Sequence, residues 1–270
     1  MITMLPGFPG ILFYSALLLF PLAIFSQSEI MEVDGAITLG DSENSSPKPG
    51  TIRYNSAIKD FEGWNGTFWI SLTRGFKQGS VSDIDGNSYR TVIIGTQEWM
   101  AENLNTSRYQ NGDEIPNTIS NQGWTGLTSG SYAYYDNLPG NYEDSYGKLY
   151  NGYAMNDGRG LCPTGWSVPE LSDWTALINY LGGLEIAMGK LKETGFEYWE
   201  VPNLNATNES GFTGRPGGYR ADNGNFSGEG IWGLFGFLNS SFASLNTQNN
   251  DLLLFGDILK YGFSVRCLKD

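Results

Sequence analysis

The stretch "RGLCPTGWSVPELSDWTALINYLGG", residues 159–183, joins a cysteine and two prolines to a short amphipathic run. The apolar residues of the run recur at the spacing that gathers side chains on one face of a helix: Trp174, Leu177, Ile178 and Leu181. Gly182 and Gly183 follow, and glycine readily adopts the left-handed conformation that ends a helix. The stretch therefore predicts a helix that begins near residue 170 and ends at Gly182.

Acidic residues stand at the start of this predicted helix. Pro169 fixes the direction from which the chain approaches it. Glu170 or Ser172 must then be the N-cap residue, and Asp173 falls in the first turn, where the helix dipole favours negative charge. Because these roles explain both carboxylates, we favour them over a catalytic carboxylate pair.

The amino-terminal sequence is typical of a signal peptide. An apolar run from Ile11 to Phe25 is short for a membrane span and suits the apolar region of such a peptide, although no Lys or Arg precedes it. We expect residues 1–26 to be removed and the remaining chain to be extracellular or at the cell surface. No cysteine lies near the cleavage point, so a lipoprotein anchor is not expected. Later apolar runs, such as Leu252–Phe255, are too short to span a bilayer.

The chain has two cysteines, Cys162 and Cys267. Cys162 could be a nucleophile beside the carboxylates of the predicted helix, or one half of a disulfide. An even pair in an exported chain favours the disulfide. Closing a loop of about 100 residues would stabilise the fold by about 4–5 kcal/mol. We therefore expect a Cys162–Cys267 bond and no catalytic cysteine.

Composition excludes several classes of function. The 270 residues carry a formal net charge of −13, which repels nucleic acid. There is no histidine, the commonest general base and a common metal ligand, so no metal or cofactor is expected. The segment Asp83–Asn87 could be taken for a calcium loop, but it lacks the later bidentate glutamate of an EF-hand, and we favour a turn. The 36 glycines indicate a loop-rich, β-rich protein.

Turn signals divide the chain into a small module and a main domain. Residues 27–73 form the module, in which Asn65-Gly66 predicts the turn of a β-hairpin. Residues 74–82 are a predicted linker, and residues 83–270 are the main domain. Its first element is predicted to be a hairpin over 83–104 that turns at Asp85-Gly86. The apolar strand residues of that hairpin are Tyr89, Val92, Ile94 and Trp99.

The rest of the main domain alternates loops and short elements. Residues 105–145 are predicted to form a long ordered surface loop with short strands, and residues 146–156 a short helix. Gly152 weakens a helix and a strand alike in that second segment, so a strand is the alternative there. From Gly211 onward the pattern is β and turn. It ends in a closing strand that carries Phe263 and Val265 on one face and Cys267 at its end.

Six motifs occur in order along the main domain: "DIDGNSYRTVIIGTQEWMAENLN", "YGKLYNGYAMN", "LCPTGWSVPELSDWTAL", "GKLKETG", "ATNESGFTGRPGGYR" and "GFSVRCLKD". Together they resemble the Fibrobacter succinogenes major paralogous domain family of exported bacterial proteins over about residues 83–270. That family is distantly similar to the C-type-lectin-like and formylglycine-generating-enzyme folds. The resemblance implies an α+β, C-type-lectin-like fold, with short helices packed on a twisted antiparallel sheet and long loops. Residues 33–72 separately resemble hairpin segments of phage-tail-fibre-like proteins, which implies a homo-oligomer.

The sequence departs from the family pattern at several places. Glu170 replaces the usual threonine at the helix start, Ser167 replaces a histidine, and Gly152 replaces an aromatic residue. A usual "GYWWSST" segment appears as residues 231–236, "IWGLFG". If a ligand surface used those aromatic residues, it is changed in this chain.

Three functions remain from these observations. The first is a non-catalytic domain that binds glycan or another extracellular macromolecule, for adhesion or display. Trp124, Tyr134 and Tyr135 are expected to be exposed. Together with Asp136 and Trp232 they would then be the ligand site. The second is an assembly component that oligomerises through residues 33–72. The third, an enzyme related to formylglycine-generating oxidases, is disfavoured because its reactive cysteine pair would be consumed by the disulfide.

Overall fold

The computed structural model of the chain describes residues 47–55, 60–64, 69–72, 79–239, 241–248, 253–255 and 259–270. The predicted signal peptide, residues 1–26, and the predicted turn at Asn65-Gly66 lie outside these ranges. None of the helices in the described part of the chain has the length and hydropathy of a membrane span.

The amino-terminal module contains a three-stranded antiparallel sheet in the order β1-β2-β3. Its strands are β1 (Ile52–Asn55), β2 (Asp60–Trp64) and β3 (Trp69–Ser71). The β2–β3 pairing, which joins Trp64 to Trp69, confirms that the two halves of the predicted hairpin pair. The strand β1 is an addition that the sequence did not predict.

A five-stranded sheet in the order β4-β5-β6-β16-β9 opens the main domain. Its strands are β4 (Gly79–Ser82), β5 (Ser88–Ile94), β6 (Gln97–Met100), β16 (Leu268–Lys269) and β9 (Trp166–Ser167). The predicted linker is wrong for residues 79–82, because these pair with β5 from Gly79↔Thr91 to Ser82↔Ser88. The chain turns at Asp85-Gly86 as predicted. All four predicted apolar strand residues are buried: Tyr89, Val92, Ile94 and Trp99.

The larger sheet follows the order β14-β13-β12-β10-β15-β8-β7, with β11 paired to β10. Its strands are β7 (Tyr132–Ala133), β8 (Leu149–Asn151), β10 (Gly217–Arg220), β11 (Phe226–Glu229), β12 (Trp232–Phe237), β13 (Ser241–Asn246), β14 (Leu253–Phe255) and β15 (Gly262–Phe263). The expectation of a wholly antiparallel sheet is wrong at one place, since β10 and β12 pair in parallel through Gly218 and Gly233. The single closing strand is also replaced by β15 and β16, although Phe263, Val265 and Cys267 are all fully buried.

Short helices connect and cover the sheets. They are α1 (Asn121–Thr125), the 3-10 turn η1 (Tyr135–Asn137), α2 (Pro139–Tyr146), α3 (Gly152–Met155), α4 (Leu171–Tyr180) and α5 (Leu184–Leu191). The prediction of one helix over residues 146–156 is wrong in its first half, which is β8. The switch to α3 occurs at Asn151, whose side chain accepts a hydrogen bond from Ala154 N at 2.9 Å. The predicted surface loop over 105–145 also contains two helices.

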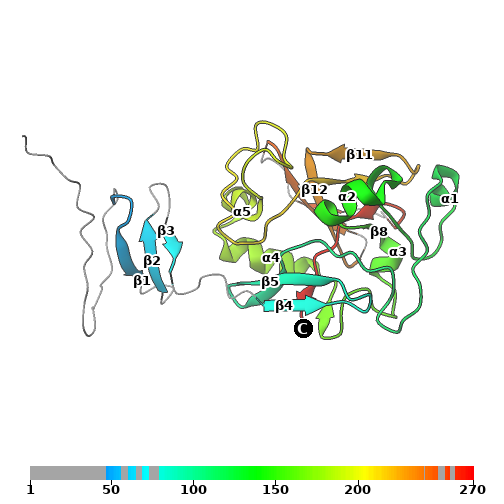
Figure 1. Cartoon of the computed structure of the whole chain (residues 1–270), viewed down its shortest axis with the longest axis horizontal. Coiled ribbons are helices and arrows are strands. Elements are labelled where there is room, and N and C mark those ends of the chain that lie inside the picture. Colours follow the sequence, from blue (N-terminus) through cyan, green and yellow to red (C-terminus); the bar gives the residue numbers. More distant parts are fainter. Residues whose placement is uncertain are drawn as a thin grey trace, which may run out of the picture. The chain divides into compact units, whose positions relative to one another are not determined.

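Helix α4 forms where the quoted stretch predicts it. Glu170 is the N-cap, and its backbone N–H donates to Asp173 Oδ2 at 2.8 Å. Gly182 follows the helix with φ of 106°, the left-handed conformation expected there. Trp174 packs against Trp99 of β6 and Phe235 of β12, with ring centroids 5.1 and 6.0 Å apart. Figure 1 shows α4 running beside β5, so the helix fills the core between the two sheets.

Candidate functional site

A disulfide joins Cys162 to Cys267, 105 residues apart in the sequence, with a Cα–Cα distance of 5.9 Å. This confirms the pairing that the two cysteines predict. Both residues are buried within a second core cluster. Cys267 precedes β16 directly and Cys162 lies four residues before β9, so the bond reinforces the β9–β16 pairing. Since each sulfur is bonded to the other, neither is a free thiolate.

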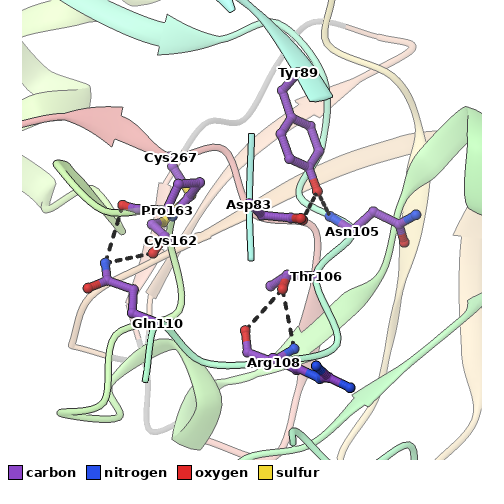
Figure 2. The surroundings of a disulfide bond; sticks show 9 residues. All are labelled: Asp83, Tyr89, Asn105, Thr106, Arg108, Gln110, Cys162, Pro163 and Cys267. Atoms are coloured by element: carbon purple, nitrogen blue, oxygen red, sulfur yellow. Dashed lines mark hydrogen bonds between the residues drawn. A yellow bond between two sulfur atoms is a disulfide. The ribbon is translucent and has the colours of Figure 1, made fainter. Parts of the chain in front are cut away.

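A hollow of about 270 Å³ lies next to the disulfide and is lined by residues 82–84, Thr106, Arg108, Gln110 and residues 161–164. Figure 2 shows that its polar side chains bind other parts of the chain. Gln110 Nε2 donates to Cys162 O at 2.6 Å and to Pro163 O at 3.2 Å. Thr106 Oγ1 donates to Arg108 O at 3.0 Å. These bonds hold the loop to the disulfide, so the hollow serves the fold.

The carboxylate of Asp83 is also committed to structure. Its Oδ1 accepts from the backbone N–H groups of Asp85 and Asn87, at 3.0 and 2.9 Å. Its Oδ2 accepts from Asn87 Nδ2 at 2.8 Å and from the Tyr89 hydroxyl at 2.6 Å. This arrangement closes the β4–β5 turn, as the turn interpretation of Asp83–Asn87 predicts. Within the described ranges, no group of three or more acidic or cysteine side chains could hold a metal ion.

The structure corrects one predicted site residue, Trp124. Its side chain is 0 % exposed, and the indole Nε1 donates to Lys260 O at 2.7 Å. The guanidinium of Arg220, also buried, lies 4.3 Å from the ring centroid. The expectation of an exposed Trp124 is therefore wrong, because Arg220 of β10 and the residues before β15 cover it.

The other predicted residues point to different places. Tyr134 turns inward, where its hydroxyl donates to Glu143 Oε1 at 3.2 Å. Tyr135, the next residue, faces Phe226 of β11, with ring centroids 5.4 Å apart. Asp136 is exposed in the left-handed conformation, with φ of 51°. Trp232 begins β12 and is half-buried against the second core cluster. The structure brings together Tyr135 and Asp136 but not the whole predicted set.

Tyr135 belongs to a wider group of rings that we call the aromatic cluster: Tyr135, Tyr142, Tyr146, Tyr198 and Phe226. Consecutive members lie 5.4 to 6.0 Å apart between ring centroids. Such offset and edge-to-face contacts stabilise aromatic pairs beyond the area they bury. Arg215 stacks on the Tyr198 ring at 3.9 Å and donates from Nε to Glu193 Oε2 at 2.6 Å. The rings are thus held in fixed orientations.

Glu229 connects the aromatic cluster to a shallow hollow, which we call the Glu229 hollow. Tyr146 donates from its hydroxyl to Glu229 Oε1 at 3.0 Å, and the backbone N–H of Glu229 donates to the Tyr135 hydroxyl at 3.4 Å. The hollow has a volume of about 500 Å³ and is lined by residues 196–201, Glu229 and Gly230. Its rim carries Phe196, which is 63 % exposed, and the exposed carboxylates of Glu197 and Glu200.

Three phenols of the aromatic cluster, those of Tyr135, Tyr142 and Tyr146, remain protonated at neutral pH. Burial raises the pKa of Tyr135, Tyr142 and Tyr146, and the negative charge of Glu229 raises it further for Tyr146. The hollow therefore presents the rings of Phe196 and Tyr198 and three carboxylates, and Glu229 joins it to the phenol of Tyr146. This set can stack on an apolar ligand face and accept hydrogen bonds from ligand hydroxyl or amino groups.

A model described as the Fibrobacter succinogenes major domain matches residues 92–269. The chain belongs to this family. The match spans the main domain from β5 to β16, including the disulfide, α4 and the Glu229 hollow. No curated protein and no solved structure matches the chain. The likeness of the Fibrobacter succinogenes major domain to C-type lectins therefore remains a prediction, while the mixture of sheets and short helices is α+β.

Most of this site in the Fibrobacter succinogenes major domain could not be predicted from the sequence. Tyr142 and Tyr146 stand in a tyrosine-rich segment for which the sequence predicts loop and helix but no role in binding. Tyr198, Phe226 and Glu229 lie in separate segments, and no spacing links them. The one usable signal was the density of tyrosines between residues 132 and 153.

Proposed function

We propose that this domain is a non-catalytic carbohydrate-binding module that works outside the cell or at its surface. The observation that carries the proposal is the Glu229 hollow, where exposed and half-buried rings meet three carboxylates. Sugar rings offer apolar faces that pack on aromatic side chains, and hydroxyl groups that donate to carboxylates. The bonded cysteines support a binding role over thiol catalysis.

The negative charge of the chain and of the hollow limits the class of carbohydrate that the site can bind. The chain carries a formal net charge of −13, and Glu197, Glu200 and Glu229 line the hollow. An acidic polysaccharide would meet like charge there, whereas a neutral or amino sugar would not. We therefore expect neutral glycans or glycans with amino groups as ligands.

Affinity electrophoresis tests the proposal. The full chain is run through gels that contain a β-glucan, a mannan, soluble chitosan or, as the acidic comparison, alginate. We expect retardation by a neutral or amino polysaccharide and none by alginate. Phe196→Ala and Tyr198→Ala should each weaken that retardation about tenfold, since both rings line the hollow and an aromatic anchor typically contributes more than 1 kcal/mol to binding.

Tyr180→Ala is the matched control, because Tyr180 is a half-exposed tyrosine on α4, outside the residues that line the hollow. It should leave the retardation unchanged. Retardation by alginate alone, no retardation by any glycan, or equal effects of Tyr198→Ala and Tyr180→Ala would refute the proposal.

A second candidate function is homo-oligomerisation through the amino-terminal module, residues 33–72. The observation that favours it is that Ile52 and Leu72 of this small sheet are 51 % and 50 % exposed. A sheet of three strands is close to the lower limit for independent stability, so partner strands would complete it. Native mass spectrometry of the chain with and without residues 33–72 tests this. An unchanged mass class after deletion would remove the candidate.

A further inference from the structure

Lys148 is a buried lysine that ends the segment between β6 and β8. It is 2 % exposed and directly precedes β8. Its Nζ donates to the backbone carbonyl of Asn105 and lies 3.8 Å from Glu143 Oε1. Its own backbone N–H donates to Leu104 O at 3.2 Å. These contacts hold the amine of Lys148 against Asn105, the residue that follows Leu104.

Asn105 also carries a side-chain amide near this amine. Its Nδ2 donates to Glu143 Oε1 at 3.1 Å. Among the described residues, no group donates to its Oδ1, although this oxygen is buried. Buried amide oxygens normally have a partner, so the lone Oδ1 is unusual. A single carboxylate oxygen, Glu143 Oε1, thus faces both the amine of Lys148 and the amide of Asn105.

Burial favours the uncharged amine. The rings of Tyr132 and Tyr134, which lie 5.0 and 5.3 Å from Lys148 Nζ, favour the charged form instead. Burial lowers the pKa of Lys148, and the carboxylates of Glu143, Asp85 and Asp83 oppose this effect. A lysine whose pKa is lowered by burial has a larger fraction of free amine at neutral pH, and the free amine is the nucleophile.

We propose that Lys148 and Asn105 join in an intramolecular isopeptide bond promoted by Glu143. The amine nitrogen of Lys148 attacks the side-chain carbonyl carbon of Asn105, forming a C–N bond. Asn105 Oδ1 takes up the electron pair of the carbonyl. The carboxylate of Glu143, whose Oε1 faces both nitrogens, receives a proton from the attacking nitrogen and passes it to the amide nitrogen.

The step ends when the electron pair on Oδ1 re-forms the carbonyl, the old C–N bond of Asn105 breaks and ammonia leaves. Lys148 and Asn105 are then linked by a secondary amide, Glu143 is regenerated, and no oxidant or reductant is consumed. The attack requires Lys148 Nζ to reach the side-chain carbonyl carbon of Asn105. The backbone carbonyl of the same residue already contacts Lys148 Nζ, and it also accepts from Asn87 Nδ2 at 3.2 Å, which keeps the backbone in place.

The bond would join the two ends of the segment formed by residues 105–148. This segment contains α1, β7, η1 and α2, and it supplies three rings of the aromatic cluster. Its two ends already meet through the Lys148 and Leu104 backbones. The isopeptide bond would make that closure covalent and, unlike the disulfide, insensitive to reducing agents.

Peptide mapping of the full-length wild-type protein tests the proposal. Trypsin cuts after Arg90, Arg108, Lys148 and Arg159, so the unlinked chain yields residues 91–108 and 109–148 as separate peptides. The bond blocks cleavage at Lys148. We therefore expect residues 91–108 attached to 109–159, with a mass about 17 Da, one ammonia, below the sum of the two. Ring closure at an asparagine or at Gln27 also loses one ammonia. The linked peptide, and not the mass loss alone, therefore demonstrates the isopeptide bond.

Variants assign the roles of the three residues. Lys148→Arg and Asn105→Ala should abolish the linked peptide, and Glu143→Gln should lower its yield more than about tenfold. Asn105→Asp should still form the bond with loss of water. Lys190→Arg, at a lysine paired with Glu209, is the matched control and should keep the linkage. Recovery of 91–108 and 109–148 as separate peptides from the wild-type protein would overturn the proposal, whatever the variants do.

Discussion

Lys192 shows how the fold accommodates a buried positive charge without a carboxylate. The side chain is 0 % exposed, and its Nζ donates to Leu204 O at 2.7 Å and to Asn246 O at 3.0 Å. The ring centroid of Trp199 lies 5.5 Å away. Arg220 and Arg266 are bound by backbone carbonyls and aromatic rings in the same way. In each case the cation binds backbone carbonyls, most of them in loops.

Lys192 should give the protein a distinct pH dependence. Burial lowers its pKa to about 8, whereas an unfolded lysine has a pKa of about 10.4. Between these values the unfolded chain binds one more proton, so the free energy of unfolding rises with pH. Relative to Lys192→Met, the wild type should gain up to about 1.4 kcal/mol per pH unit from pH 8 to 10. Urea unfolding of both proteins at pH 7, 8, 9 and 10 measures this difference, and a constant difference would contradict it.

Helix α5 is placed by a close contact at one glycine. A Cβ atom on Gly189 would lie 2.1 Å from the backbone oxygen of Asn205, so the loop after residue 200 can approach α5 only where a side chain is absent. The backbone N–H of Thr207 donates to Gly189 O at 2.8 Å, which fixes the same approach. The loop that lines the Glu229 hollow is thereby anchored to the helix at its far end.

Two glycine-to-alanine changes test this contact. Alanine favours a helix over glycine by about 0.5–1 kcal/mol, so Gly140→Ala in α2, where a Cβ would meet nothing within 4 Å, should cost no stability. Gly189→Ala should instead lose about 1–3 kcal/mol, because the clash outweighs that preference. Thermal unfolding of both variants provides the comparison. A gain in stability for Gly189→Ala would show that the loop moves aside without cost.

Local sequence signals predict some elements well but do not predict elements that depend on contacts with distant parts of the chain. The apolar spacing of Trp174 and Leu177 and the glycines after Leu181 specify α4 by themselves, because helix contacts are local. Strand β4 has the sequence Gly-Ser-Val-Ser, which has the composition of a loop, and only its pairing with β5 makes it a strand. Propensity is a weak guide for such a segment, since the neighbouring strand decides its state.

The site was harder to predict than the fold, for the same physical reason. Trp124 stands among Gly, Asn and Ser residues and was expected to be exposed, but Arg220 covers it from a distant strand. Tyr198 and Glu229 meet Tyr146 only because β11 and the loop after α5 lie together. By contrast, the disulfide could be predicted, because two cysteines allow only one intramolecular pairing.

At the scale of the whole molecule, the disulfide should be the largest single contribution to stability. It closes a loop between residues 105 positions apart, which corresponds to about 4–5 kcal/mol in the chain-entropy treatment. The double variant Cys162→Ala/Cys267→Ala should therefore lower Tm by more than about 10 °C. Binding to glycan by the folded fraction should be unchanged. Calorimetry of the variant and of reduced wild type measures the shift, and equal Tm values for oxidised wild type and variant would contradict the expectation.

The position of β16 has a consequence for the order in which the domain is assembled. This strand, the last in the sequence, lies between β6 and β9, pairing Leu268 with Trp99 and with Ser167. A nascent chain that has not yet released residues 268–269 has a gap in the middle of its small sheet and no partner for Cys162. The small sheet can therefore be completed only after residues 268–269 have been released, and until then a holdase can act on the unfolded polypeptide.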